Sequence, residues 1–169
     1  TEPLQLSWLD NHLTIRGQQI PGGELVMNYI EAYCRPGSTD RDWQETVIPH
    51  RTELISLSPN ASELRLRCHV RDGVVVDHQI NTTQDEVTFL ITANNSTDKA
   101  SEMDWGQPCL PVDKFTGRDK TTYIDKCFFY RQGQLVRLPT QPWATQARYT
   151  PSGAQSAGAA GREARVCGH

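Results

Sequence analysis

Motifs that announce a reaction are missing from this chain of 169 residues. No nucleophile elbow, phosphate-binding loop, zinc-spaced cysteine set or helical metal motif occurs in it. The sequence also lacks any window near the roughly eighteen consecutive apolar residues that cross a bilayer, so we expect no membrane insertion. It begins Thr1-Glu2-Pro3, without a basic and apolar leader. These absences leave the function to be argued from weaker signals.

A basic excess is missing as well, because the formal net charge is -3. A nucleic-acid function would therefore need a local basic patch. The best candidate is the stripe of Arg65, Arg67 and Arg71, but Asp77 and Asp85 follow nearby in the sequence. A charged strand face is usually a solvated one. We expect no nucleic-acid partner.

Cysteines are few and far apart, and their number is odd: Cys34, Cys68, Cys109, Cys127 and Cys167. That pattern fits neither a dense disulfide framework nor a zinc site. We expect mostly buried thiols, and a disulfide between two of the four cysteines other than Cys68 stays open. No metal and no cofactor are expected.

What the sequence does contain is alternation of apolar and polar residues from Glu63 to Asn95, in three segments separated by turn residues. Leu64, Leu66 and Cys68 alternate with arginines, which is the period of two that indicates a half-buried strand. The Val87 to Ala93 segment repeats the pattern. The stretch is therefore predicted to be a β-meander.

The register of this meander is set by the turn at Asp72-Gly73. A three-residue loop of Arg71, Asp72 and Gly73, with Gly73 in a left-handed conformation, pairs Cys68 with Val76, Leu64 with Ile80 and Arg67 with Asp77. This register sorts the faces, with one exception. His78 falls opposite Leu66 on the apolar face.

The rest of the chain is predicted to be mostly strands as well. An N-terminal hairpin is expected across Asp10-Asn11, and a loop from Ser38 to Glu45. A final hairpin is expected from strands at 123–130 and 135–138, across Gln132-Gly133. Residues 24–34 favour a strand over a helix. The expected strand of residues 46–57 bends at Pro49, and any strand in residues 105–116 is short or at an edge. These elements predict an all-β, antiparallel sandwich at 1–149 and a disordered low-complexity tail at 150–169.

The run VTFLITANNSTDKASEMDW, from Val87 to Trp105, and the hairpin before it resemble galactose mutarotase-like β-supersandwich domains. Domains of this type in epimerases, glycoside hydrolases and polysaccharide lyases handle carbohydrate. The resemblance implies that the chain is the N-terminal half of a supersandwich or a smaller sandwich. Asp104 to Pro108 lacks the histidine that the epimerases place there, which argues against mutarotation. A periplasmic or secreted location is favoured.

Sugar recognition needs an aromatic ring for the apolar face of a pyranose and planar polar side chains for its hydroxyls. Two stretches supply this combination, one around Trp43 and one around Trp105. The candidate ligand-binding residues are Arg35, Trp43, Trp105, Gln107 and Asp113. The alternative is that both tryptophans are core or rim residues with incidental polar neighbours.

Candidate catalytic residues are His50, His78, Glu31 and Asp104, since imidazole titrates nearest neutral pH and carboxylates serve as its partners. His69 and His78 would face opposite sides of one sheet, so they cannot share a metal ion; His50 and His78 with a carboxylate remain open. The sequence thus predicts a domain that binds or processes a sugar or polysaccharide, using a hydrolase, lyase or epimerase reaction if it is an enzyme. The alternative is a structural or protein-interaction sandwich.

Overall fold

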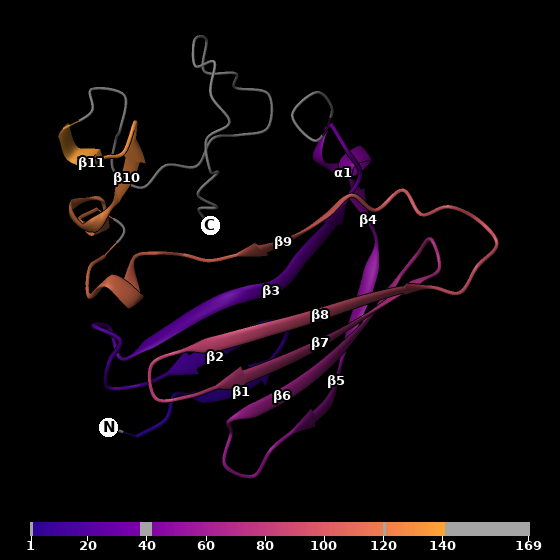
Figure 1. Ribbon diagram of the computed structural model, residues 1–169, viewed down its shortest axis with the longest axis horizontal. Helices are drawn as coiled ribbons and strands as arrows, with labels where there is room; N and C mark the ends of the chain where they lie inside the picture. The colour runs from indigo at the N-terminus through magenta and orange to yellow at the C-terminus, as the bar shows by residue number, and fades with distance from the viewer. Residues whose placement is uncertain (1, 38–41, 120, 141–169) are drawn as a thin grey trace.

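The computed structural model describes residues 2–37, 42–119 and 121–140, which form two antiparallel β-sheets packed face to face (Figure 1). The first sheet holds β1 (Gln5–Leu9), β2 (His12–Arg16), β3 (Glu24–Cys34) and β4 (Val47–Ile48) in that order, and β9 (Trp105–Cys109) also pairs with β3. The second sheet runs in the order β5 (His50–Leu57), β6 (Glu63–Val70), β7 (Val74–Thr82) and β8 (Val87–Asn95). The predicted all-β sandwich is confirmed.

Short elements complete the described chain. They are the helical turn α1 (Trp43–Thr46), the 3-10 turns η1 (Lys114–Thr116), η2 (Tyr123–Lys126) and η3 (Leu138–Thr140), and a separate hairpin of β10 (Phe128–Arg131) and β11 (Gln134–Arg137). None of the helices in the described ranges is long and apolar enough to span a bilayer. The tail predicted at 150–169 lies outside the described residues.

The meander has the register that the sequence predicts. Leu64 pairs with Ile80, Cys68 with Val76 and Leu66 with His78, and the same ladder sets Arg67 beside Asp77. Gly73 closes the loop with φ of 99°, a left-handed conformation that costs glycine little, and its N–H donates to the Val70 carbonyl at 3.0 Å. The turn chemistry and the burial pattern point to one register, and the fold adopts it.

Three local predictions are wrong. Trp43 to Glu45 belongs to α1 and not to a loop, because the chain makes one helical turn there before it enters β4. The predicted strand of residues 46–57 is two strands in different sheets: β4 pairs with β3, β5 pairs with β6, and Pro49 lies between them. The first half of the strand predicted at 123–130 is the 3-10 turn Tyr123–Lys126, and the strand of the final hairpin begins only at Phe128.

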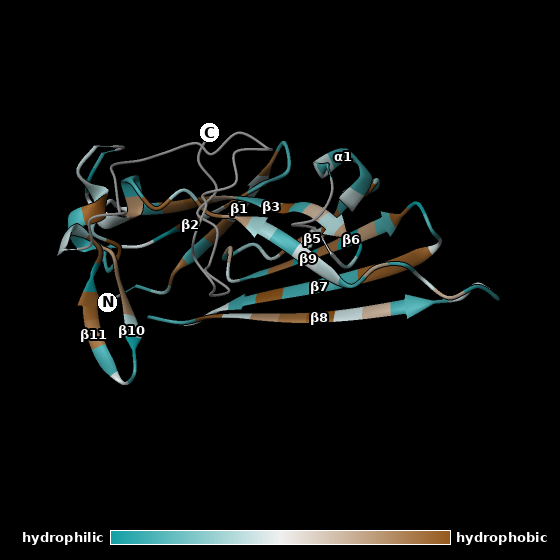
Figure 2. Cartoon of the chain, turned by 90° about the horizontal axis from the view of Figure 1, so that it is seen from above, coloured by the Kyte–Doolittle hydropathy of each residue, from teal (hydrophilic) through white to brown (hydrophobic). Residues whose placement is uncertain are grey.

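The core lies between the two sheets and draws on both. Leu6, Leu13 and Ile15 of the first sheet meet Leu64 and Ile80 of the second, each less than 5% exposed. Burying one such side chain contributes about 1.5–3 kcal/mol relative to leaving it in water. Figure 2 shows β3 and β9 in one layer and β7 and β8 in the other, with apolar stretches along β7 and β8.

Strand β3 carries the irregularity that shapes one end of this core. Its pairing with β9 shifts register between Asn28 and Ala32, so alternation along β3 is imperfect. Tyr29 and Tyr33 are four residues apart, so strand alternation places them on one face, and both are buried, while Glu31 between them is only half-buried. One strand thus sends two tyrosines into the interior.

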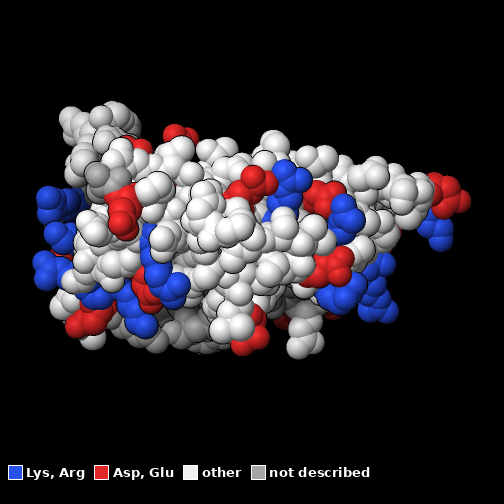
Figure 3. Space-filling view, turned by 90° about the horizontal axis from the view of Figure 1, so that it is seen from below, with Lys and Arg blue, Asp and Glu red and all other residues white. Residues whose placement is uncertain are grey.

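Charges of both signs are interspersed on the surface seen in Figure 3. In the stripe that was considered for nucleic acid, Arg65 pairs with Glu63 and Arg67 with Asp77, each at 2.7 Å. Such exposed pairs contribute little to stability. Cys34, Cys68 and Cys109 are buried and Cys127 is half-buried, and no disulfide joins any two of these four cysteines. The predicted absence of a nucleic-acid partner stays a prediction.

Candidate functional site

A cleft of about 510 Å³ opens between the sheets, where β3 and β9 face β7 and β8. Small-molecule sites have volumes of about 300–1,000 Å³ and mostly apolar walls with a few polar groups. Most residues of this wall are apolar or aromatic, and the polar side chains among them include His78 and Asp104. The whole wall consists of Met27, Tyr29, Ile30, Tyr33, Val76, His78, Phe89, Ile91, Ala93, Met103, Asp104, Trp105, Gly106 and Pro108.

The cleft exists because the first sheet covers β7 but not all of β8. Ile80 and His78 of β7 are 0% and 2% exposed, whereas Phe89 and Ile91, their partners on β8, are 37% and 52% exposed. Neighbouring residues of one ladder row share a face, so all four side chains point toward the first sheet. At β8 that sheet ends, and the interior face opens to solvent.

His78 forms the polar base of the cleft together with two tyrosines of β3. The Tyr29 hydroxyl lies 2.9 Å from His78 Nδ1, and the Tyr33 hydroxyl lies 2.8 Å from His78 Nε2. Both ring nitrogens are therefore satisfied, as a buried imidazole requires. The Tyr29 ring also lies edge-on to His78, at 5.3 Å between centroids, and 5.5 Å from Phe89.

The network continues from Tyr33 to Cys68, whose Sγ lies 3.6 Å from His78 Nε2 and 3.1 Å from the Thr52 hydroxyl. Burial lowers the pKa of His78 to about 4, so the ring is neutral at pH 7 and carries one N–H. Burial likewise raises the pKa of Tyr29 and of Tyr33, which keeps both hydroxyls protonated.

The tautomer of His78 decides what this network can offer to a ligand. If Nδ1 carries the proton, the ring donates to the Tyr29 oxygen, and the Tyr29 hydroxyl is left to donate elsewhere. If Nε2 carries the proton, the Tyr29 hydroxyl donates to Nδ1, and its oxygen can accept from a ligand. The proton chain from Tyr33 through His78 to Tyr29 can therefore run in either direction.

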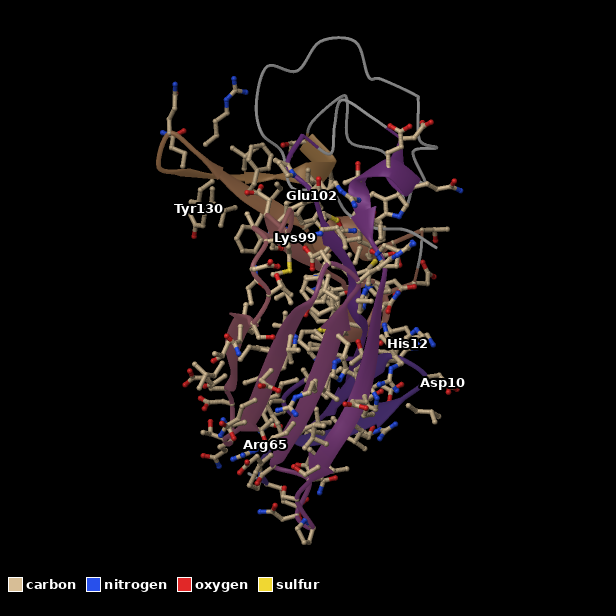
Figure 4. All side chains as sticks on the ribbon, turned by 90° about the vertical axis from the view of Figure 1, so that its right-hand side faces the viewer. Asp10, His12, Arg65, Lys99, Glu102 and Tyr130 are labelled. Carbon is tan, nitrogen blue, oxygen red and sulfur yellow. The ribbon has the colours of Figure 1, made fainter. Side chains whose placement is uncertain are left out.

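A second, shallower hollow of about 320 Å³ lies beside the cleft, and Asp104 and Met103 line both. Arg35 crosses it: Nε donates to Glu102 Oε2 at 2.6 Å and the guanidinium donates to the Val47 carbonyl at 3.0 Å. Glu102 belongs to the segment between β8 and β9 (Figure 4). Arg35 thus ties this segment to the first sheet.

The structure brings three of the predicted site residues to the cleft. His78 lies at its base, and Asp104 and Trp105 line it from the start of β9. Asp104 is exposed and Trp105 is half-buried, so both side chains can be reached from solvent.

The other predicted residues lie elsewhere. Gln107 donates to Glu31 at 2.8 Å, and neither residue lines the cleft. Asp113 accepts from the Lys114 backbone at the start of η1. Half-buried Trp43 starts α1, outside the cleft wall.

His50 touches the network without lining the cleft, since its ring packs edge-on against Tyr33 at 5.0 Å between centroids. Burial lowers its pKa. Within the described ranges, no hydrogen bond of His50 or His78 with a carboxylate side chain is present, and no group of three histidine, cysteine or acidic side chains could hold a metal ion.

Sequence reasoning missed the partners of His78. A histidine on an apolar strand face must find hydrogen bonds, so the anomaly itself signals a buried network. Tyr29 and Tyr33 lie 49 and 45 residues away along the chain, however, so no local pattern pairs them with His78. Comparisons with family models, with curated proteins and with solved structures found no match for this chain.

Proposed function

We propose that this chain is a ligand-binding β-sandwich, and that its ligand is a small molecule with a mostly apolar body and one polar group. The observation that supports this is the open apolar cleft with a hydrogen-bonding base made by Tyr29 and His78. The apolar body would displace water from Met27, Phe89 and Met103.

The polar group of the ligand would meet the Tyr29 hydroxyl. Because the proton chain can run in either direction, that hydroxyl serves a carbonyl acceptor and a hydroxyl donor equally well. Asp104 at the rim adds an acceptor that favours ligands with a second donor group. A neutral His78 places no charge at the base, so the site favours uncharged polar groups.

Binding of N-phenylnaphthylamine, an uncharged fluorescent aromatic, tests the cleft directly. The wild type is expected to bind one molecule with saturation. Met103→Trp places an indole in the cleft and is expected to weaken binding at least about tenfold, which corresponds to about 1.4 kcal/mol. Met103→Leu conserves volume and is the matched control, expected to bind as the wild type does.

Circular dichroism and thermal unfolding of the two Met103 variants show whether both are folded. No saturable binding by the wild type, or equal binding by folded Met103→Trp, would contradict the proposal. Native mass spectrometry of the purified protein adds a search for a ligand that the cleft retains.

A second candidate is the sugar or polysaccharide ligand that the resemblance implies. It is favoured by one observation, namely that the Trp105 ring and the Asp104 carboxylate line the same cleft. An aromatic ring covers the apolar face of a pyranose and a carboxylate accepts from its hydroxyls. In a hydrolase, lyase or epimerase, Asp104 would be the catalytic carboxylate, since it lines the cleft.

Glycan-array binding by the wild type and by Trp105→Ala separates this candidate from the first. A sugar-binding site predicts a signal that the variant loses. Equal and negligible signals, combined with saturable binding of N-phenylnaphthylamine, would leave the apolar ligand alone.

A further inference from the structure

Strand β8 is an edge of the second sheet and differs from the opposite edge, β5, in every feature that protects sheet edges (Figure 1). Edges are blunted by charged side chains, proline and bulges. β5 follows Pro49, carries Arg51 and Glu53, and shifts register at Leu54. β8, with the sequence VTFLITANN, has no charge, no proline and no glycine, and pairs with β7 without a shift.

The ladder fixes which groups of β8 face outward. Thr83 N–H donates to the Glu86 carbonyl, and Thr82 N–H points away from β8 to the Ser62 carbonyl. Since bonded and non-bonded pairs alternate in an antiparallel ladder, Leu90 and Thr92 bond to β7. The groups of five residues point to the open edge: Val87, Phe89, Ile91, Ala93 and Asn95. Within the described ranges no backbone group outside β7 bonds them.

We propose that β8 pairs antiparallel with β8 of a second copy of this chain, with the two-fold axis at Ile91. In this register the five outward-facing residues of each copy all pair with one another. Each brings one N–H and one C=O, which gives up to about ten hydrogen bonds, the number that a typical protein interface contains.

Side chains agree with this register. The axis sets Phe89 beside Ala93 of the partner subunit, so a large side chain meets a small one in both symmetry-related places. Ile91 lies beside the partner's Ile91. The exposed apolar surface of Phe89, Leu90 and Ile91, which are 37–58% exposed, loses contact with water. Other centres of symmetry pair fewer of the five outward residues.

Molar mass in solution tests this proposal. The wild type, 19.0 kDa per chain, is expected at twice that mass by light scattering at micromolar concentration. Ile91→Lys and Ile91→Glu each place like charges at the axis, and each is expected to weaken the dimer at least about tenfold. An equimolar mixture of the two variants is expected to form the dimer again.

Thr88→Lys is the matched control, because it adds the same charge to an exposed β8 position whose backbone bonds β7, far from the axis. It is expected to remain dimeric. Amide exchange gives a second readout. Phe89, Ile91 and Ala93 should exchange slowly in the wild type and fast in Ile91→Lys, while Leu90 and Thr92 stay protected in both.

A monomeric wild type would overturn the proposal, and so would an Ile91→Lys variant that stays dimeric. A monomeric wild type that binds a synthetic peptide of residues 87–95 would show that a strand of another chain occupies the edge. Neither result decides the cleft proposal, which is tested separately by N-phenylnaphthylamine binding to the Met103 variants.

Discussion

At the scale of single residues, His78 is the side chain on which the interior is organised. A histidine among leucines and valines is costly unless both its nitrogens are bonded, and Tyr29 and Tyr33 bond them from the facing sheet. The three residues join β3 to β7 through polar contacts in an otherwise apolar layer. Their contribution is best measured by removing partners one at a time and together.

Tyr29→Phe and Tyr33→Phe are each expected to lower the free energy of unfolding by about 1–3 kcal/mol. Tyr29→Phe leaves the buried Nδ1 of His78 without a partner, and Tyr33→Phe leaves Nε2 with only the weaker contact of the Cys68 sulfur. The triple variant Tyr29→Phe, Tyr33→Phe, His78→Leu is expected to lose less free energy of unfolding than the three single variants lose in sum. Urea unfolding of the two tyrosine variants, of His78→Leu and of the triple variant checks this. Single variants as stable as the wild type would show that the network contributes nothing.

At the scale of elements, hairpin loops carry much of the register. The β6–β7 loop needs Gly73, whose φ is 99°, and Asp72 in the same loop accepts from Val74 N–H at 3.3 Å and from the Ser101 hydroxyl at 2.5 Å. The β10–β11 loop needs Gly133, whose φ is 79°. The two glycines differ in surroundings, since a Cβ on Gly73 would meet the Thr97 methyl and a Cβ on Gly133 would meet nothing.

Gly133→Ala is therefore expected to cost about 1–2 kcal/mol, the penalty of a left-handed alanine, and Gly73→Ala more than that. Adding Thr97→Ser to Gly73→Ala removes the methyl group, keeps the hydroxyl that bonds Asn95, and is expected to recover the difference. Thermal unfolding measures all three. Equal costs at both glycines would contradict the steric argument.

At the scale of the whole molecule, buried and paired groups make stability depend on pH. The pKa of His78 is lowered to about 4 in the folded protein. Between that value and its ordinary one, near 6.5, only the unfolded chain binds the proton. Burial lowers the pKa of His50 in the same direction, and the Arg67 partner lowers the pKa of Asp77.

The free energy of unfolding is accordingly expected to be constant between pH of about 7 and about 8 and to fall as pH drops from about 6.5 to about 4, by about 3 kcal/mol from His78 alone. The variant with Leu at His78 and Phe at both tyrosines should lose most of this dependence. Urea titrations at several pH values check it. A wild type whose stability is flat across this window would show that His78 binds a proton without unfolding.

Thiol reactivity reports on the same closed interior. Cys34, Cys68 and Cys109 are at most 1% exposed, and burial raises the pKa of Cys34 to about 11. In a Cys127→Ser, Cys167→Ser background, dithionitrobenzoate is expected to modify no thiol of the folded protein and all three in denaturant. Fast modification of the native protein would contradict the core described for both sheets.

Much of the second sheet could be predicted from the sequence, and less of the site. Alternation and the Asp72-Gly73 turn determine the β6–β7 register through neighbours in sequence, which is why Leu66 was correctly set opposite His78. The cleft depends instead on where one sheet stops covering the other. That boundary is set by β9 pairing with β3 across about seventy residues of chain, and no local pattern encodes it.

The alternate residues of β8 have two roles at once. Phe89, Ile91 and Ala93 turn their side chains toward the hollow and their main-chain groups toward the open border of the sheet. A chain that pairs with that border would therefore lie beside the entrance of the hollow. A ligand held inside would restrict the motion of the same three residues. Ligand binding is therefore expected to change the affinity of strand pairing at β8, and strand pairing is expected to change the affinity for the ligand by the same factor.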